Sequence, residues 1–105
     1  MLESRFQSNL RMELLGLFPG CIILKNDEQQ CQGFPDLLIL YQNKWAALEC
    51  KKSPREPFQP NQEYYLELLD DMSYASVIFP ENKEEVLDEL QRAFSVRRSA
   101  CVLVR

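Results

Sequence analysis

The chain has 105 residues, of which 46% are hydrophobic and 27% are charged, and its formal net charge is -4. This length and composition are typical of one globular domain, so we expect a single domain over residues 1–105. The chain contains no histidine, which excludes serine–histidine and cysteine–histidine triads and any histidine proton shuttle. An enzyme of this composition has to rely on carboxylates, lysine or a bound metal ion.

No segment has the pattern of a membrane span or of a secretory signal. The longest apolar runs, such as residues 37–41, are far shorter than the roughly 20 residues that cross a bilayer. The first residues do not contain a basic stretch followed by an apolar one. We therefore expect a cytoplasmic protein.

The cysteines show no C-x-x-C spacing, and without histidine they do not form the usual pattern of a structural zinc site. We expect them to be reduced residues, mostly in the core. They are Cys21, Cys31, Cys50 and Cys101.

Charge is distributed in blocks along the chain. Residues 44–55 carry four basic side chains and one acidic one, whereas residues 56–91 carry ten acidic side chains and one lysine. Residues 92–105 add four arginines. The acidic sum therefore conceals two short basic blocks, which are the parts of the chain suited to an anionic partner; we call the first, residues 44–55, the basic segment.

The N-terminal third predicts a helix followed by a strand. Apolar residues recur at three- and four-residue spacing over residues 2–17, and Pro19 and Gly20 end this helix. Cys21–Leu24 predicts a short strand. The following polar segment, residues 26–33, is typical of a turn.

Two further strands predict an antiparallel hairpin. Leu37–Tyr41 is apolar throughout, which indicates burial on both faces, and Trp45–Cys50 returns after a short turn. Pro54, Pro57 and Pro60 keep the next segment irregular.

The second half predicts a helix over Asn61–Met72, a strand over Ser76–Phe79, a third helix after Pro80 and a last strand over Cys101–Val104. The expected inward residues of the two helices are Tyr65, Leu66, Leu68 and Leu69, and then Val86, Leu87, Leu90 and Phe94. A helical crossover makes the third and fourth strands parallel. The predicted fold class is α/β, with a mixed central sheet flanked by helices and an αβββαβ order.

Two acids and a lysine are notable for their positions. Asp36 opens the second strand, and Glu49 and Lys51 lie two residues apart near the end of the third. Residues i and i+2 of a strand project from the same face, and the hairpin can bring Asp36 beside them. Charged groups in apolar strands are costly unless they are paired or bind a metal. On spacing alone, a structural salt bridge between Lys51 and one of the carboxylates is the better explanation.

The order of a larger set of residues resembles the PD-(D/E)XK nuclease superfamily, and in particular its VRR-Nuc branch. The matching residues are Glu3, then Gly33-Phe34-Pro35-Asp36, then Glu49-Cys50-Lys51, then Gln62. The resemblance extends over residues 3–79 and implies a restriction-endonuclease-like core with Asp36, Glu49 and Lys51 as the catalytic residues.

The resemblance also implies a metal site. Asp36 and Glu49 would bind Mg²⁺ or Mn²⁺ together with the backbone carbonyl of Cys50, because such hard cations prefer oxygen ligands. Glu3 would be a further metal ligand; the alternative is a favourable charge in the first turn of a helix. Lys51 would orient the attacking water or balance the charge of the phosphoryl group.

Three further residues complete the expected site. Gln62 corresponds to a glutamine that supports the site, and its alternative is a solvent-facing position in a first helical turn. Lys52 and Arg55 extend the basic segment and are candidate contacts to DNA phosphates, although solvated surface charge explains them nearly as well.

The resemblance implies an endonuclease acting on branched DNA such as Holliday junctions or flaps, since stand-alone members of this branch look like junction resolvases. We expect a homodimer, which supplies contact area and two nicking sites, and the compact form is compatible with a phage protein acting in the host cytoplasm. One alternative is a catalytically silent nuclease fold, a binding or regulatory subunit that docks a basic partner through its acidic 56–91 surface. The other is a structural α/β domain with an accidental resemblance.

Overall fold

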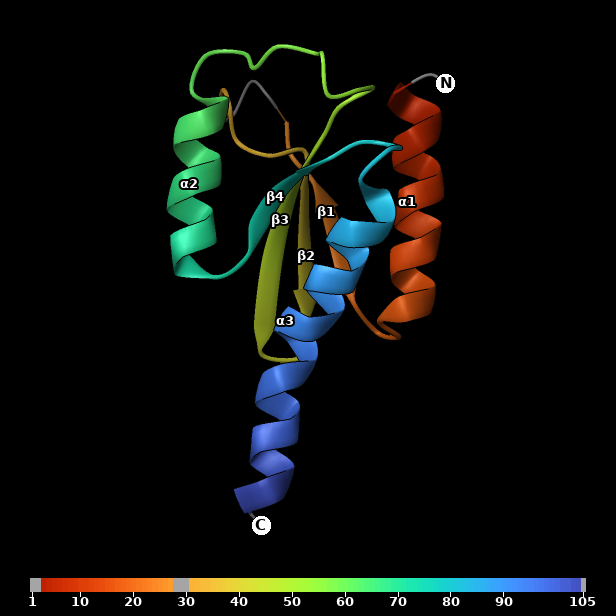
Figure 1. The fold of residues 1–105 in the computed structure, drawn as a ribbon, viewed down its shortest axis with the longest axis vertical. Coiled ribbons are helices and arrows are strands. Elements are labelled where there is room, and N and C mark those ends of the chain that lie inside the picture. Colours follow the sequence, from red (N-terminus) through yellow and green to blue (C-terminus); the bar gives the residue numbers. More distant parts are fainter. Residues whose placement is uncertain (1–2, 28–30, 105) are drawn as a thin grey trace.

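The computed structural model describes the backbone of residues 3–27 and 31–104, and the side chains of residues 4–27 and 31–95. Over these residues the chain forms three helices and four strands (Figure 1). They are α1 (Glu3–Leu17), β1 (Ile22–Lys25), β2 (Leu37–Tyr41), β3 (Lys44–Cys50), α2 (Gln62–Met72), β4 (Ala75–Ile78) and α3 (Lys83–Val104). The predicted αβββαβ order is confirmed, with a long third helix after it.

The four strands form one mixed sheet in the order β1-β2-β3-β4. β1 and β2 are antiparallel, as are β2 and β3, whereas β3 and β4 are parallel and are joined through α2. The hairpin turn between β2 and β3 has only two residues, because Tyr41 pairs with Lys44. The predicted hairpin and the predicted parallel pair are therefore both present.

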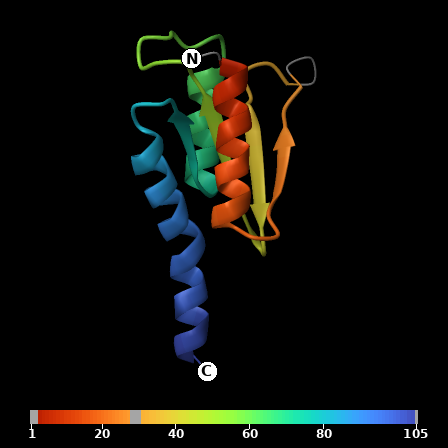
Figure 2. The same cartoon turned by 90° about the vertical axis from the view of Figure 1, so that its right-hand side faces the viewer.

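Helices cover the two faces of the sheet unequally. α1 and α3 pack on one face over a core that includes Phe6, Leu10, Leu14, Leu37, Ile39, Leu48, Ile78, Leu87, Leu90 and Phe94. α2 packs on the other face with a smaller cluster around Ala47, Leu69 and Ala75. Figure 2 shows α1 in front of the sheet and the C-terminal half of α3 extending beyond it.

Alternation in the central strands divides their apolar side chains between these two clusters. Leu37 and Ile39 of β2 belong to the larger core, and Leu38 between them packs against the α2 cluster. Leu37 and Ile39 are fully buried, and Leu38 and Leu40 are half-buried. The predicted burial of β2 is thus complete for Leu37 and Ile39 and partial for Leu38, Leu40 and Tyr41.

The predicted last strand over Cys101–Val104 is wrong, because α3 continues as a helix to Val104. Residues 83–104 contain neither glycine nor proline, so nothing in this segment interrupts the helical hydrogen bonds. The apolar residues near the C-terminus suit a strand by composition, yet continuation of an existing helix adds one backbone hydrogen bond per residue.

The inward face of α2 also differs from its prediction at one position. Leu69 is buried, and Tyr65 and Leu66 are half-buried in the smaller cluster, whereas Leu68 is 41% exposed. The apolar side chains of α2 therefore extend around the helix beyond the side that packs on the sheet. For α3, all four predicted inward residues are buried.

Cys21 and Cys50 are buried, as predicted, and Cys31 is half-buried; within the described part of the chain none of the three forms a disulfide. Cys101 lies outside the residues whose side chains are described. Among the described helices, none combines the length and the apolar character needed to cross a membrane.

Candidate functional site

The hairpin brings the predicted acids together at one end of the sheet. Asp36 directly precedes β2, and Leu37 pairs with Leu48, so Asp36 lies across from the end of β3. The amide N–H of Cys50 donates a hydrogen bond of 2.9 Å to Oδ2 of Asp36. This bond fixes the Asp36 carboxylate against the last residues of β3, beside Glu49.

Glu49 is a buried carboxyl, with 4% of its surface exposed. Its Oε2 accepts a hydrogen bond of 2.9 Å from Nε2 of Gln62. Its Oε1 is buried and has no hydrogen-bond partner among the described residues. Burial, followed by repulsion from the neighbouring Asp36, raises the pKa of Glu49 to about 8, against the opposing effect of Lys51.

Lys51 is buried, at 3% exposure, in a cradle of oxygen atoms. Its Nζ donates to Oε1 of Gln62 at 2.8 Å and to the carbonyl oxygen of Pro57 at 3.2 Å. Oε2 of Glu49 lies at 3.8 Å from Nζ and Oε2 of Glu56 at 3.7 Å. Two hydrogen-bond acceptors and the carboxylate of Glu56 therefore compensate the cost of burying this ammonium group, and the carboxyl group of Glu49 adds to them when it is ionised.

Gln62 connects the lysine to the buried acid. Its Oε1 accepts from Lys51 Nζ and from the amide of Gln59 at 2.7 Å, and its Nε2 donates to Glu49. Both ends of the amide are used, and the side chain is 8% exposed. The alternative of a solvent-facing residue is therefore wrong for Gln62.

The loop that carries Asp36 packs tightly against the start of α2. Gly33 has φ +89°, and a Cβ there would lie 2.6 Å from Cβ of Asn61 and 2.7 Å from the carbonyl oxygen of Pro60. Glycine is required at this position both by its backbone conformation and by this close approach. The contact holds Gln62, the next residue of α2, in register with the loop before β2.

These side chains line a cavity of about 320 Å³. Its lining is mostly polar and consists of Gln32, Gly33, Phe34, Asp36, Glu49, Lys51, Glu56, Gln59 and Gln62. The residues come from the loop before β2, the end of β3, the segment 52–61 and the start of α2. The cavity gives the buried acid and the lysine access to a ligand.

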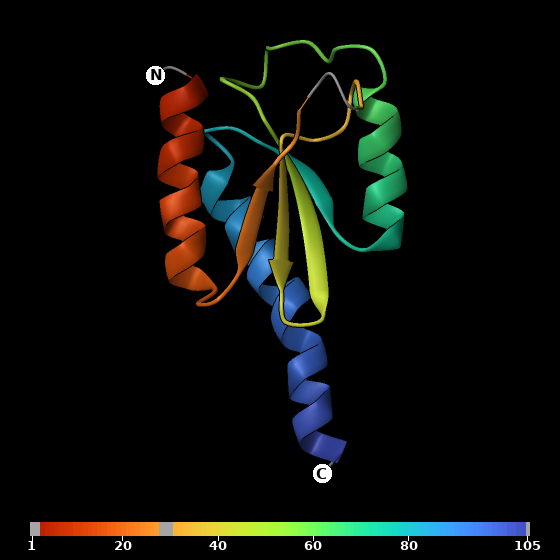
Figure 3. The ribbon, with the colours of Figure 1, turned by 180° about the vertical axis from the view of Figure 1, so that it is seen from behind.

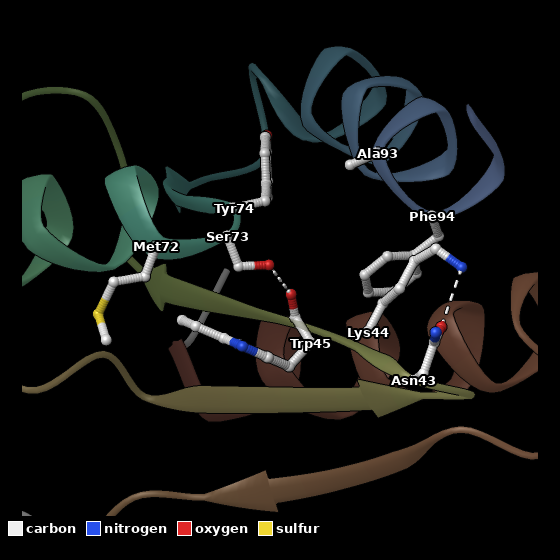
Figure 4. Close-up of a pocket in the computed structure, with 8 residues that line it drawn as sticks. All are labelled: Asn43, Lys44, Trp45, Met72, Ser73, Tyr74, Ala93 and Phe94. Atoms are coloured by element: carbon white, nitrogen blue, oxygen red, sulfur yellow. Dashed lines mark hydrogen bonds between the residues drawn. The ribbon is translucent and has the colours of Figure 1, made fainter. Parts of the chain in front are cut away.

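A second cavity, of about 260 Å³, lies at the opposite end of β3 (Figure 4). Trp45 and Tyr74 line it, and the hydroxyl of Ser73 donates to the carbonyl oxygen of Trp45 at its rim. No carboxylate belongs to its lining.

A third cavity, of about 430 Å³, is lined by residues of α1 and α3 that include Glu13, Glu84 and Asp88, but by none of the predicted site residues. The first cavity is the candidate functional site because it contains Asp36, Glu49 and Lys51.

Other predicted site residues are placed differently. Lys52 and Arg55 are exposed on the segment that follows β3 and do not line the cavity. Cys50 contributes its backbone, and its side chain is buried in the core. Glu3 is the first residue of α1, and its side chain lies outside the described part of the chain.

Several residues near the site were missed by the sequence analysis, Glu56 and Phe58 among them. Glu56 is half-buried, lines the cavity and accepts a hydrogen bond of 2.9 Å from the amide of Lys52. The ring centroid of Phe58 lies 5.4 Å from Nζ of Lys51. Both belong to the irregular proline-containing segment, where no periodicity indicates which side chains point inward. The only signal in the sequence was that Glu56 is an acidic residue directly after the basic segment.

The donor set of the site fits a hard divalent cation. Over the described residues, no group of three or more acidic, cysteine or histidine side chains is arranged to hold a metal. Magnesium, however, needs only one or two protein carboxylates and keeps several waters. Asp36 supplies one carboxylate, and Glu49 supplies another whose buried Oε1 has no hydrogen-bond partner among the described residues.

Comparisons of the chain with protein-family models, with curated proteins and with solved structures found no match.

Proposed function

We propose that this chain is a metal-dependent DNA endonuclease with the restriction-endonuclease-like core of the PD-(D/E)XK superfamily, similar to the VRR-Nuc branch. The observation that carries the proposal is the grouping of Asp36, Glu49 and Lys51 in one polar cavity, with Oε1 of Glu49 buried and unpartnered among the described residues. A bound cation would give this buried oxygen a partner and would offset the repulsion between the neighbouring carboxylates of Asp36 and Glu49.

Asp36 and Glu49 would hold Mg²⁺ or Mn²⁺, with the Cys50 carbonyl and Glu3 as further ligands. When bound, such a cation polarises a phosphodiester oxygen and lowers the pKa of a bound water. The chain's own contribution is to fix the two carboxylates: the Cys50 amide holds Asp36, and the Gln62 amide holds Glu49.

Lys51 would stabilise negative charge on the phosphoryl group or orient the attacking water. Its two hydrogen bonds use two of three N–H groups and leave one for a phosphate oxygen. Gln62 and the Pro57 carbonyl keep the ammonium in place, so little reorganisation is needed when substrate binds.

For the substrate we propose DNA, with branched structures such as Holliday junctions or flaps preferred, and a homodimer acting in the cytoplasm. The exposed side chains of Lys52 and Arg55 follow directly after Lys51 in the chain and would contact phosphates of the backbone.

The test is a cleavage panel with labelled junction, flap and duplex DNA in Mg²⁺ or Mn²⁺. We expect cleavage by the natural chain and a loss of about 100-fold or more in Asp36→Asn and Lys51→Met. Asn at position 36 keeps an oxygen for the Cys50 amide, so the fold is retained. Asp71→Asn, on the exposed side of α2, is the matched control and should cleave normally.

A catalytically silent binding subunit is the second candidate, and the exposed acids of α2 and α3 favour it. They are Glu63, Glu67, Asp70, Asp71, Glu84, Glu85 and Asp88. Such a surface suits a basic partner protein and repels DNA phosphates. Absence of cleavage of every substrate with both metals, by a folded protein, would favour this candidate over the nuclease.

A further inference from the structure

Glu56 is an acidic residue of the polar cavity that the proposed mechanism does not use. Its side chain is 26% exposed and lines the cavity together with Asp36, Glu49 and Lys51. Oε2 of Glu56 lies 3.7 Å from Nζ of Lys51. At this distance the two groups attract each other as opposite charges without the geometry of a hydrogen bond. The cavity therefore contains a counter-ion for its lysine.

The segment between β3 and α2 brings Glu56 to this position. Figure 3 shows the segment passing over the end of the sheet where β3 ends and β2 begins. Oε1 of Glu56 accepts a hydrogen bond of 2.9 Å from the amide of Lys52, and the amide of Glu56 donates to the carbonyl oxygen of Ser53 at 3.2 Å. The next residue, Pro57, has a restricted φ and accepts from Lys51 at 3.2 Å. Side chain and backbone are both held, so the carboxylate is a positioned negative charge beside Lys51.

The three acids of the cavity have different neighbours. Asp36 and Glu49 each accept a hydrogen bond from an amide, and their mutual repulsion disfavours the ionised form of Glu49. Over the described residues, the acids do not form a group of three arranged to hold a metal. Asp36 and Glu49 are the pair suited to a divalent cation. Glu56 is the acid suited to the ammonium group of Lys51.

This division of the acids balances the charge of the occupied site. With the proposed divalent cation bound, its two positive charges would offset the carboxylates of Asp36 and Glu49. The carboxylate of Glu56 would offset the ammonium of Lys51, which leaves these groups without net charge. If Glu56 were neutral, one positive charge would remain, and a ligand with two negative charges would gain more from it than a ligand with one.

Phosphate groups of nucleic acids differ in charge according to their position. An internal phosphodiester carries one negative charge, whereas a terminal phosphate monoester loses a second proton with a pKa of about 6 and carries nearly two above neutral pH. The Coulomb energy between a positioned charge and a ligand is proportional to the ligand's charge. Glu56 therefore repels a terminal phosphate about twice as strongly as an internal one.

We propose that Glu56 is a specificity-determining residue, whose carboxylate balances the charge of Lys51 and so favours internal phosphodiesters over terminal phosphate monoesters in this cavity. The inference rests on the proposed function, and it names the charge state of the phosphate group that the site selects. It agrees with cleavage within a strand, where the reacting phosphate carries a single charge.

The test compares two small ligands that differ by one methyl group and one charge, thymidine 5′-phosphate and its methyl ester. Their dissociation constants are measured by NMR titration of the full chain at about pH 8, with Ca²⁺ in place of Mg²⁺. We expect Glu56→Gln to tighten binding of thymidine 5′-phosphate about tenfold and of the methyl ester about threefold, because the energy change is proportional to the ligand's charge.

Three further variants are the controls. Glutamine keeps an oxygen for the amide of Lys52, so Glu56→Gln retains the local hydrogen bond. Glu56→Asp keeps the charge and should retain the natural preference, whereas Glu56→Ala should shift the preference in the same direction as Glu56→Gln. Glu67→Gln, exposed on α2 and outside the cavity, makes the same change in net charge and should alter either dissociation constant by less than about twofold.

Equal tightening of both ligands in Glu56→Gln would overturn the inference, because a residue that acts only through shape does not distinguish ligand charge. Loss of Ca²⁺ binding in this variant would also overturn it, since Glu56 would then be a metal ligand. If the natural chain and its variants bound neither ligand, the inference and the proposed phosphate site would fail together.

Cleavage of DNA separates the two proposals. A chain that cleaves DNA but shows equal tightening of both ligands overturns the inference alone. A charge-dependent shift in a chain that cleaves no DNA supports the inference and rejects only the catalytic proposal.

Discussion

The Glu49 carboxyl experiences opposing effects on its charge. Burial and the neighbouring Asp36 disfavour its ionised form, whereas Lys51 at 3.8 Å favours it, and the net effect is a pKa of about 8. In the protein without metal, Glu49 is therefore mostly protonated at neutral pH. A cation that binds both carboxylates reverses the repulsion between them and favours the ionised form.

This raised pKa predicts how stability depends on pH in the presence of a chelator. The stabilising contribution of protonated Glu49 is fully present below its ordinary pKa of 4.5 and is lost as pH rises through about 8. In that window the folded protein retains a proton that the unfolded chain releases, so the free energy of unfolding falls with pH.

We expect Glu49→Gln to remove this dependence and to be more stable than the natural chain at pH 9, by on the order of 2 kcal/mol. Urea denaturation between pH 4 and 9 measures the difference. Parallel curves for the two proteins would show that Glu49 does not titrate in this range.

The amide of Gln62 is the second residue-scale feature that can be tested. We expect Gln62→Ala to destabilise the fold by about 1–3 kcal/mol, because it removes one hydrogen bond from buried Lys51 and one from buried Glu49. Glu63→Ala, one residue further on and exposed, is the control and should change stability by less than about 0.5 kcal/mol. Equal unfolding midpoints for the two variants would contradict the bridging role.

At the scale of elements, the site depends on contact between the loop before β2 and the start of α2. Gly33→Ala should be more destabilising than Gly20→Ala, because both glycines have a positive φ, of +89° and +88°, but only Gly33 has backbone atoms within 3 Å of the added Cβ. Gly20→Ala carries the backbone strain alone, about 1 kcal/mol.

Thermal or chemical denaturation measures both glycine variants, and the excess in Gly33→Ala should be about 1–3 kcal/mol. The cleavage assay provides a second readout, because the clash displaces Pro60 and Asn61 and with them Gln62. Similar losses in both variants would mean that the loop and α2 adjust freely to each other.

At the scale of the whole molecule, the net charge of -4 opposes binding to DNA. Binding then has to come from a local basic region and the metal site. We expect Lys52→Ala and Arg55→Ala each to weaken DNA binding and to reduce the salt slope by about 0.9. Both side chains are exposed, so the fold is unaffected.

Arg92→Ala is the control for these charge variants, since Arg92 is exposed on α3 and pairs with Asp88. Titrations of DNA at several salt concentrations, with Ca²⁺ in place of Mg²⁺ to prevent cleavage, give the slopes. If Arg92→Ala changed the salt dependence of the binding constant as much as Lys52→Ala, the DNA would not bind specifically beside Lys52 and Arg55.

The sequence by itself determined the order of the elements up to β4, because apolar periodicity is a local property that the chain carries wherever it packs. Leu37–Tyr41 was predicted with its observed bounds, since a turn and a charged residue flank a continuous apolar run. The extent of α3 was missed, because the apolar composition of residues 101–104 suits a strand as well as a helix, and only the preceding helix decides between them.

The grouping of Asp36, Glu49 and Lys51 also followed from sequence, since strand alternation and a hairpin leave few other arrangements. Only the tertiary structure decided the burial of Lys51, the bridge through Gln62 and the place of Glu56, because these depend on how the irregular segment 52–61 folds back over β3. The tertiary structure alone also decided that α2 covers only half of its sheet face. The sequence shows which side chains of a helix are apolar, whereas the strands on which the helix packs are known only from the folded molecule.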